Sequence, residues 1–171
     1  TVQGDIFKVD AVDADIVITD GRNRTSNISA TDVIASNGVI HVIDKVLLPA
    51  DKNIVETAIA ADPEFSILVE AVVAANLQGV LSGAGPFTVF APTNAAFAAL
   101  LTELNVTKAQ LLADVPLLTK VLTYHVVSGR VLKADVPVGT PITTVETGTF
   151  TVDSALAITD ERGRRAGIVA T

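Results

Sequence analysis

The two histidines of this 171-residue chain, His41 and His125, are its best candidates for metal binding or general-base catalysis. Both stand in apolar, β-rich stretches, and the sequence contains no cysteine that could complete a zinc site. Two imidazoles alone fall short of the usual zinc ligand set. We therefore predict that each is a buried imidazole hydrogen-bonded to the main chain, and we expect no metal site around them.

A second candidate for metal binding is the acidic cluster of Asp10, Asp13 and Asp15. Closely spaced carboxylates can ligate calcium, which takes oxygen donors. The cluster lacks the glycine and the distal glutamate of an EF-hand loop. These residues are weak candidates, and we predict a solvated acidic turn with no bound metal.

Signatures of catalysis are missing from the sequence. There is no G-x-S-x-G nucleophile elbow, no phosphate-binding P-loop and no G-x-G-x-x-G run. Ser36 precedes Asn37-Gly38 and is better explained by turn chemistry. Gly83-Ala84-Gly85 lacks the third glycine of a dinucleotide fingerprint. We predict no catalytic residue, no cofactor and no enzymatic activity.

Charge and composition exclude several partners. The net charge is −7 and aromatic residues make up 4% of the chain, so a cationic surface with stacking platforms for nucleic acid is not expected. No apolar stretch is long enough to cross a bilayer, and we predict no membrane insertion. The sequence shows neither a signal peptide nor an initiator methionine, which predicts a processed chain or a fragment.

Three tripeptides match the acceptor pattern for N-glycosylation. They begin at Asn23, Asn27 and Asn105. The first two lie near one predicted turn, which favours surface exposure. All three are candidate glycosylation sites.

The order of the predicted elements is strands, then helices, then strands. Residues 1–50 alternate apolar and polar side chains as strands do, whereas residues 51–124 carry apolar side chains at helical spacing. Short β runs follow. Within residues 51–171 the helices precede the strands, which favours an α+β fold over alternating β-α-β units.

Local signals place some element ends. Asn37-Gly38 predicts a hairpin, because both residues tolerate positive φ. Asp62-Pro63-Glu64 predicts the start of a helix, with aspartate as N-cap and proline at the first helical position. Thr107 and Gln110 predict a capping box.

A segment near the start of the chain recurs near its end. Phe7-Lys8-Val9-Asp10 and Ile16-Val17-Ile18-Thr19-Asp20 correspond to Phe150-Thr151-Val152-Asp153 and Leu156-Ala157-Ile158-Thr159-Asp160. The copies close on Thr31 and Thr171, a spacing far longer than the roughly 20–50 residues of solenoid repeats and typical of whole domains. The chain therefore resembles a window on a tandem array of domains.

Three stretches together resemble the signatures of the fasciclin domain family. They are Thr88-Val89-Phe90-Ala91-Pro92-Thr93-Asn94-Ala95-Ala96-Phe97, Leu122-Thr123-Tyr124-His125-Val126-Val127, and Ser36 to Pro49. The first resembles the family's first signature box, the second its Tyr-His motif and the third its second box. The resemblance implies an α+β fold, a wedge-shaped β-sandwich with a helical N-terminal portion, found in extracellular adhesion domains that are not typical enzymes.

The motifs stand out of family order, because the second box, normally last in a domain, precedes the first. Residues 1–50 match the C-terminal part of a fasciclin domain, and residues 51–171 match a domain that lacks its final strand. We predict that residues 32–50 complete the latter, either in cis, as in a circular permutant, or in trans, by insertion into a neighbouring chain. A third alternative is one repeat unit cut from a longer polymer. Trans assembly is favoured, because residues 1–31 duplicate 144–171 and would compete in cis.

The resulting candidate residues fall into two groups. The joining strand comprises Val39, Ile40, His41, Val42, Ile43, Val46, Leu47 and Leu48. The resemblance assigns scaffold roles to Phe90, Pro92, Asn94, Phe97, Tyr124 and His125.

We predict an extracellular or cell-surface protein, with the periplasm as an alternative location, that acts in adhesion or as a matrix component such as a biofilm filament. Its expected partners are other copies of the chain, adjacent fasciclin domains and a cell-surface or matrix molecule. The alternative function is a carrier that binds a small apolar ligand between helices and sandwich. The low aromatic content disfavours that alternative.

Overall fold

A computed structural model of the chain describes residues 1–2, 5–12 and 15–169. The chain divides into two compact units, Thr1–Lys52 (unit 1) and Asn53–Thr171 (unit 2). Asp13, one of the weak candidates for metal binding, lies outside the described residues.

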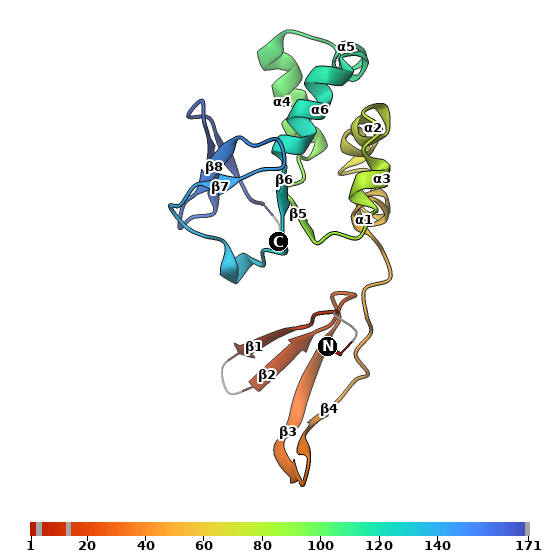
Figure 1. Ribbon diagram of the computed structural model, residues 1–171, viewed down its shortest axis with the longest axis vertical. Coiled ribbons are helices and arrows are strands. Elements are labelled where there is room, and N and C mark those ends of the chain that lie inside the picture. Colours follow the sequence, from red (N-terminus) through yellow and green to blue (C-terminus); the bar gives the residue numbers. More distant parts are fainter. Residues whose placement is uncertain (3–4, 13–14, 170–171) are drawn as a thin grey trace. The chain divides into compact units, whose positions relative to one another are not determined.

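Unit 1 is a four-stranded antiparallel meander in the order β1-β2-β3-β4 (Figure 1). Its strands are β1 (Lys8–Val12), β2 (Asp15–Thr19), β3 (Thr25–Ala35) and β4 (Gly38–Ile43). The predicted hairpin joins β3 to β4, but its turn is Ser36-Asn37, and neither Asn37 nor Gly38 has a positive φ. Gly38 is instead the fourth residue of the turn, where type I turns favour glycine.

The β3–β4 ladder is irregular in its middle. Its register shifts on both sides of Ala30. Asp32 has a φ of 59°, and its N–H donates to His41 Nδ1 at 3.4 Å. His41 thus bonds to the main chain as predicted, but the prediction that it is buried is wrong. It lies exposed on a hairpin whose residues 31–42 are all exposed.

Unit 1 has little apolar core. Among its described residues only Ile18, Asp20 and Ser26 are buried, and two of these are polar. A four-stranded sheet normally depends on one covered apolar face. Hydrogen bonds to buried polar groups therefore carry much of the organisation of unit 1.

Unit 2 begins with a helical portion. It contains α1 (Ile54–Ala60), α2 (Ser66–Ala74), α3 (Gln78–Leu81), β5 (Phe87–Val89), α4 (Asn94–Leu104), α5 (Lys108–Ala113) and α6 (Val115–Tyr124). Thr107 and Gln110 form the predicted capping box at the start of α5. In the described part of the chain, every helix is too short or too polar to cross a membrane.

Helix α2 begins later than predicted, at Ser66 rather than at Asp62-Pro63-Glu64. Its N-cap residue, Phe65, offers no side-chain hydrogen bond. The side-chain oxygen of Asn94 accepts the N–H of Ile67 at 3.0 Å instead. The cap therefore comes from a residue far along the chain, which local sequence patterns do not reveal.

The second half of unit 2 is mostly β. It contains β6 (Val126–Ser128), the 3-10 helix η1 (Lys133–Asp135), β7 (Ile142–Thr143), β8 (Thr149–Val152), β9 (Ala157–Asp160) and β10 (Arg165–Gly167). Strands β7 to β10 form one antiparallel sheet in the order β10-β9-β8-β7, and β5 pairs with β6. Figure 1 shows the helices gathered on one side of unit 2 and this sheet on the other. The arrangement agrees with the predicted α+β class.

Two apolar clusters hold unit 2 together. The larger lies among the helices around Leu118, Phe97 and Ala71. The smaller lies on the sheet, where Phe150 and Val152 pack with Ile142 and Val127. Phe90, from the first signature box, packs against the second cluster and meets Phe150 edge to face with ring centroids 5.0 Å apart.

Candidate functional site

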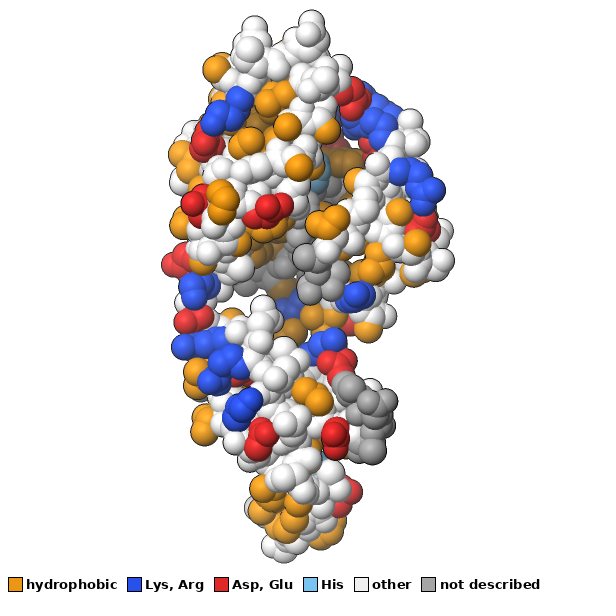
Figure 2. Space-filling view, turned by 180° about the vertical axis from the view of Figure 1, so that it is seen from behind, with side chains coloured by type: hydrophobic (Ala, Val, Ile, Leu, Met, Phe, Trp, Pro, Cys, Tyr) orange, Lys and Arg blue, Asp and Glu red, His pale blue; other side chains and the backbone are white. Residues whose placement is uncertain are grey.

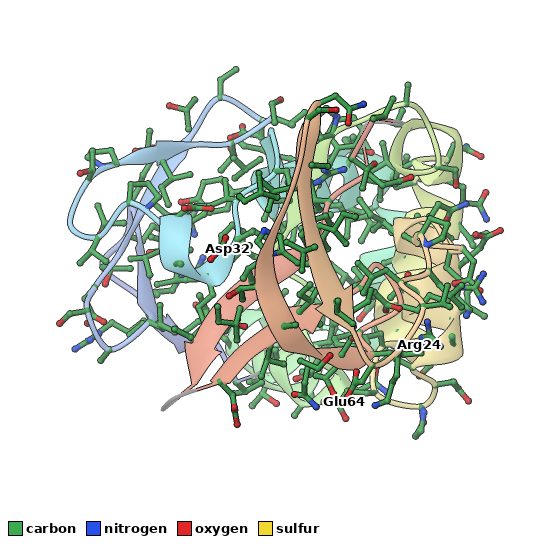
Figure 3. The ribbon with its side chains drawn as sticks, turned by 90° about the horizontal axis from the view of Figure 1, so that it is seen from below. Arg24, Asp32 and Glu64 are labelled. Atoms are coloured by element: carbon green, nitrogen blue, oxygen red, sulfur yellow. The ribbon has the colours of Figure 1, made fainter. Side chains whose placement is uncertain are left out.

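The end of the predicted joining strand is held by one carboxylate of unit 1. Oδ1 of Asp20 accepts the N–H groups of Arg22 and Arg24 at 2.9 and 3.0 Å. Its Oδ2 accepts from Nε and Nη2 of Arg24 at 3.0 and 2.7 Å, and from the N–H of Leu48 at 2.9 Å. We call Asp20 and Arg24 with this turn the Asp20 clamp; Figure 3 labels Arg24 beside the start of β3.

The clamp also binds main-chain carbonyl groups of residues 46–49. Arg24 Nη2 donates to the carbonyl oxygen of Val46 at 2.8 Å, and the N–H of Gly21 donates to that of Leu48 at 3.0 Å. Arg22 Nε donates to the carbonyl oxygen of Pro49 at 3.2 Å. The segment after β4 is thus held by its backbone, independently of its side chains.

A second carboxylate fixes the base of β4. Asp44 Oδ1 accepts the hydroxyl of Ser26 and the N–H of Asn27, both at 2.8 Å. Ser26 Oγ in turn accepts the N–H of Lys45 at 3.1 Å. The hydrogen bond from the Asn27 N–H, with help from Ser26, lowers the pKa of Asp44 below its usual value.

The charge on Asp20 is strongly favoured in the folded state. Burial alone would raise the pKa of Asp20, but the combined hydrogen bonds from Leu48, Arg24 and Arg22 outweigh it and hold that pKa well below its usual range. The folded protein therefore keeps this carboxylate ionised at all ordinary pH values.

Acid should loosen unit 1 for that reason. The pKa of Asp20 is lower in the folded than in the unfolded chain, where it is about 3.9, so the unfolded chain binds more protons in acid. Stability that Asp20 contributes above about pH 4 is lost as the pH falls below that value. The protection of β2 and β3 amides against hydrogen exchange, measured from pH 6 to 3, should fall as the pH is lowered. In Asp20→Asn this protection should depend less on pH. Equal dependence in both proteins would contradict the assignment.

The tip of the β3–β4 hairpin exposes apolar side chains on both faces. Val33 stands opposite Ile40, and Ile34 stands opposite Val39. These four side chains are 46%, 55%, 76% and 51% exposed, in the order named. Figure 2 shows hydrophobic side chains gathered at the lower end of the view, over this tip. A strand that is apolar on both faces is typical of a position covered from both sides.

The structure places the eight joining residues unevenly. Ile43, Leu47 and Leu48 are partly buried at the base of the hairpin, near the clamp. The remaining five are exposed: Val39, Ile40, His41, Val42 and Val46. Strand β4 pairs with β3 of its own unit.

Asn94 joins the first signature box to the turn before α2. Its Nδ2 donates to the carbonyl oxygen of Pro63 at 2.5 Å and to Ser66 Oγ at 2.9 Å. Its own N–H donates to the carbonyl oxygen of Glu64 at 2.9 Å, and its Oδ1 caps Ile67. Thr93 is the N-cap of its own helix, α4, whereas its neighbour Asn94 caps α2. Pro92, just before them, is half-buried.

Tyr124 and His125 connect α6 to the sheet of unit 2. The Tyr124 hydroxyl donates to the carbonyl oxygen of Thr149 at 2.5 Å, and its ring leaves Gly148 no room for a Cβ. His125 Nδ1 lies 2.7 Å from the carbonyl oxygen of Val121. Burial lowers the pKa of His125 and raises that of Tyr124, so both are neutral near pH 7. These contacts hold α6 against β8 and its preceding turn.

Two acidic residues of the predicted cluster, Asp10 and Asp15, lie among the described residues. Asp10 pairs with Lys8 at 3.0 Å, and Asp15 begins β2. In the described part of the chain, no three acidic or histidine residues come close enough to share a metal ion.

The three candidate glycosylation asparagines lie at the surface. Asn23 occupies the turn before β3 with a φ of 58°, and Asn105 ends α4 with a φ of 53°. Asn27 uses its side-chain amide to donate to Asp44 Oδ2 at 2.9 Å. A glycan at Asn27 would therefore compete with the contact that fixes β4.

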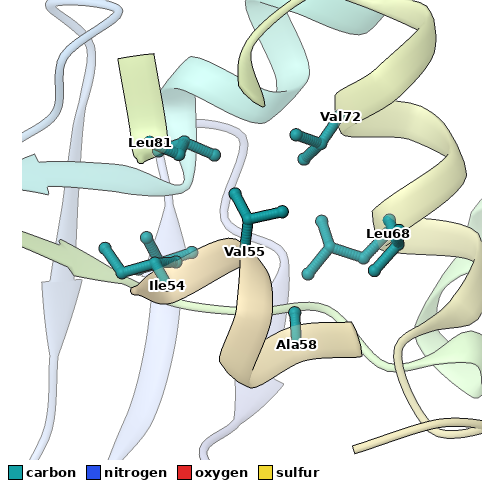
Figure 4. Close-up of a pocket in the computed structure, with 8 residues that line it drawn as sticks. Ile54, Val55, Ala58, Leu68, Val72 and Leu81 are labelled. Carbon is teal, nitrogen blue, oxygen red and sulfur yellow. The ribbon is translucent and has the colours of Figure 1, made fainter. Parts of the chain in front are cut away.

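Two cavities among the described residues are smaller than typical sites for small ligands, and the carrier alternative stays a prediction. The apolar cavity of unit 2 measures about 30 Å³ and lies between α1, α2, α3 and β5. Figure 4 shows Val55, Leu68, Val72 and Leu81 turned toward it. A second cavity, in unit 1, measures about 180 Å³ and includes Asp20. Sites for small ligands usually measure about 300–1,000 Å³.

The comparisons identify the family. The fasciclin domain profile matches residues 1–49 and 63–166, and the chain belongs to this family. A solved FAS1 domain pair from the insect cell adhesion molecule fasciclin I has the same fold, with a TM-score of 0.56 and 18% identity over 93% of this chain and 58% of that one. The α+β fasciclin fold inferred from the motifs is thereby confirmed, with sheets that do not close into barrels. Fasciclin domains of this kind are non-enzymatic adhesion domains, in agreement with the prediction that the chain is not an enzyme.

Relatives occur in bacteria and animals. Protein sll1735 of Synechocystis sp. is 46% identical over 101 residues, which cover 59% of this chain and 73% of the relative. The transforming growth factor-beta-induced protein ig-h3 of Sus scrofa is 33% identical over 118 residues, which cover 69% of this chain and 17% of the relative. The chain thus spans most of the first relative and a small part of the second.

Proposed function

We propose that this chain is an extracellular or cell-surface adhesion or matrix module that assembles head to tail. In this proposal the β3–β4 hairpin of one copy completes unit 2 of the next copy by strand addition. Residues 1–50 act as the C-terminal part of one fasciclin domain and residues 51–171 as a domain that awaits its final strand. The partners are other copies or adjacent fasciclin domains, together with a surface or matrix molecule.

The apolar hairpin tip is the observation that carries the proposal. Full burial of a Val or Ile side chain is worth about 1.5–3 kcal/mol. Of the four tip residues, three keep about half of their surface in water and Ile34 keeps 76%. Covering all four would contribute on the order of 3–6 kcal/mol before the cost of association. An uncovered apolar hairpin in a soluble domain is also a known template for pairing with another chain.

The repeat supports unit 2 as the acceptor. Residues 144–168 of unit 2 repeat residues of the segment 1–28, which in unit 1 ends inside β3 and continues into the rest of the hairpin. In the proposed assembly, the apolar faces of the hairpin pack beside residues 144–168 of a second copy. This position is equivalent to their place beside residues 1–28 in unit 1. Family membership, and the cell adhesion molecule that contains the solved FAS1 pair, support a location outside the cell.

Association should depend on protein concentration and on the hairpin tip. Sedimentation velocity of the wild-type chain is expected to show oligomers that dissociate on dilution. Ile40→Lys places a charge on the tip and should abolish association, since a charge at an apolar contact is costly. Ile40 is 55% exposed within unit 1, so the variant should still fold.

Ile59→Lys is the matched control. Ile59 lies in α1, far in sequence from the hairpin, and is 53% exposed. This variant should associate like the wild type. A wild-type chain that stays monomeric at every concentration, or equal loss in both variants, would rule out head-to-tail assembly through the hairpin.

A further inference from the structure

Asn37 and Gly38, in the turn of the β3–β4 hairpin, form a chemically reactive pair. The main-chain nitrogen of the residue after an asparagine can attack the carbonyl carbon of the asparagine side chain, which makes asparagine a labile residue. Glycine permits this attack best, because it has no Cβ to block the nitrogen or restrict the backbone. Every other asparagine of the chain is followed by a residue that carries a side chain. The pair is therefore unique in this sequence.

The structure leaves the side chain of Asn37 free to react. Asn37 is exposed in the turn, and a Cβ built on Gly38 would meet no atom within 4 Å. The side chains of Asn27, Asn53 and Asn94 are held by hydrogen bonds. Within the part of the chain that the structure describes, the Asn37 amide has no such bond. Its rotation toward the Gly38 nitrogen therefore costs no contact.

The nucleophile needs only a small local opening. Ala35 and Gly38 are the last pair of the β3–β4 ladder, and the ends of an element open at the lowest free energy. The ladder is also interrupted further along, where its register shifts and Asp32 has a φ of 59°. The base of β4 stays fixed through Asp44. The tip can thus open while the rest of unit 1 remains folded.

The reaction consumes only water. The Gly38 nitrogen loses its proton and bonds to Cγ of Asn37, the bond between Cγ and Nδ2 breaks, and Nδ2 leaves as ammonia with that proton. Water then opens the cyclic imide at either of its two carbonyl carbons. The product is aspartate or isoaspartate, and its new carboxyl group is ionised near neutral pH. In isoaspartate the main chain passes through the former side chain and is longer by one carbon atom.

We propose that Asn37 deamidates spontaneously and that this modification weakens assembly of the chain as the protein ages. The consequence rests on the proposed function, whereas the reaction itself needs only two neighbouring residues. Residues 33–40 carry no charged side chain, so the new carboxylate is the first charge at the tip, beside the exposed pair of Ile34 and Val39. A charge at an apolar contact is costly. Isoaspartate also changes the length of the turn, which fixes the register of a hairpin.

Peptide mapping by mass spectrometry tests the reaction on the full chain, incubated near neutral pH for increasing times. Asn37 should convert at least tenfold faster than Asn76, an exposed residue with a φ of 55° that Leu77 follows. Gly38→Ala should slow conversion of Asn37 at least tenfold, and the open space around Gly38 lets this variant fold. Fragmentation that cleaves the N–Cα bond should identify isoaspartate among the products. Conversion no faster than that of Asn76, or unchanged in Gly38→Ala, would overturn the inference.

Asn37→Asp isolates the effect of the new charge on assembly. In sedimentation velocity this variant should associate at least tenfold more weakly than fresh wild-type chain, whereas Asn76→Asp should stay within twofold. Aged wild-type chain should lose association as its modified fraction rises, and aged Gly38→Ala should keep it. Association unaffected by complete conversion of Asn37 would overturn the regulatory role. A fresh chain that is monomeric at every concentration would reject the assembly and that role together, while conversion at Asn37 would still establish the modification site.

Discussion

Asn94→Ala should destabilise unit 2 by about 2–4 kcal/mol, because the side chain makes three hydrogen bonds that each contribute about 1 kcal/mol and leaves partly buried groups unpaired when removed. The bonds lost are those to Pro63, Ser66 and Ile67. The last of them caps α2 from a distance, because its own N-cap residue, Phe65, makes no side-chain hydrogen bond. Leu68 and Ala71 of α2 lie in the larger apolar cluster, so fraying of this helix would disturb the core.

Thr93→Ala is the control for Asn94→Ala. Thr93 is the adjacent residue and caps its own helix by accepting the Ala96 N–H at 3.2 Å. Loss of an ordinary N-cap costs about 0.5–2 kcal/mol. Urea unfolding followed by helical circular dichroism should therefore give a lower free energy of unfolding for Asn94→Ala than for Thr93→Ala. If the two variants lose equal stability, the hydrogen bonds of Asn94 to Pro63, Ser66 and Ile67 do not stabilise unit 2 beyond an ordinary cap.

The cap of α2 shows where sequence reasoning stops. The capping box of Thr107 and Gln110 was predictable, because both partners lie within one turn of helix. The prediction that α2 starts at Asp62-Pro63-Glu64 was wrong, because the residue that caps this helix is Asn94. A helix end capped from a distant loop leaves no local pattern, so only the fold reveals it.

For the hairpin of unit 1, strand pairing could also be predicted from the sequence, but its turn and its exposure could not. Apolar runs on both sides of a turn sufficed to predict that β3 and β4 pair. The turn conformation and the exposure of His41 did not follow, since they depend on a bulge at Asp32 and on which faces remain uncovered. The clamp was also beyond prediction: Asp20 was visible only as a turn residue, and Leu48 meets it from the other end of the unit.

The repeat nevertheless carried more information than either copy alone. It predicted that Asp20 and Asp160 occupy equivalent places, and the two turns agree in their hydrogen bonds. Differences between the copies then become interpretable. Ser26, which fixes Asp44 in unit 1, corresponds to Ala166 in unit 2. The contact between Ser26 and Asp44 is therefore a feature of unit 1 that its copy in unit 2 cannot make with an alanine.

Gly21→Ala should release the segment of residues 46–50 from the Asp20 clamp of unit 1. The new Cβ would collide with main-chain atoms of Pro49 and Ala50, which cannot rotate away as a side chain can. Overpacking of this kind typically costs about 1–3 kcal/mol, and here it also breaks the bond from the Gly21 N–H to the Leu48 carbonyl oxygen. Amide exchange at Leu48 and in β2 should accelerate accordingly. Gly38→Ala, where a Cβ meets no atom within 4 Å, is the control and should leave exchange unchanged.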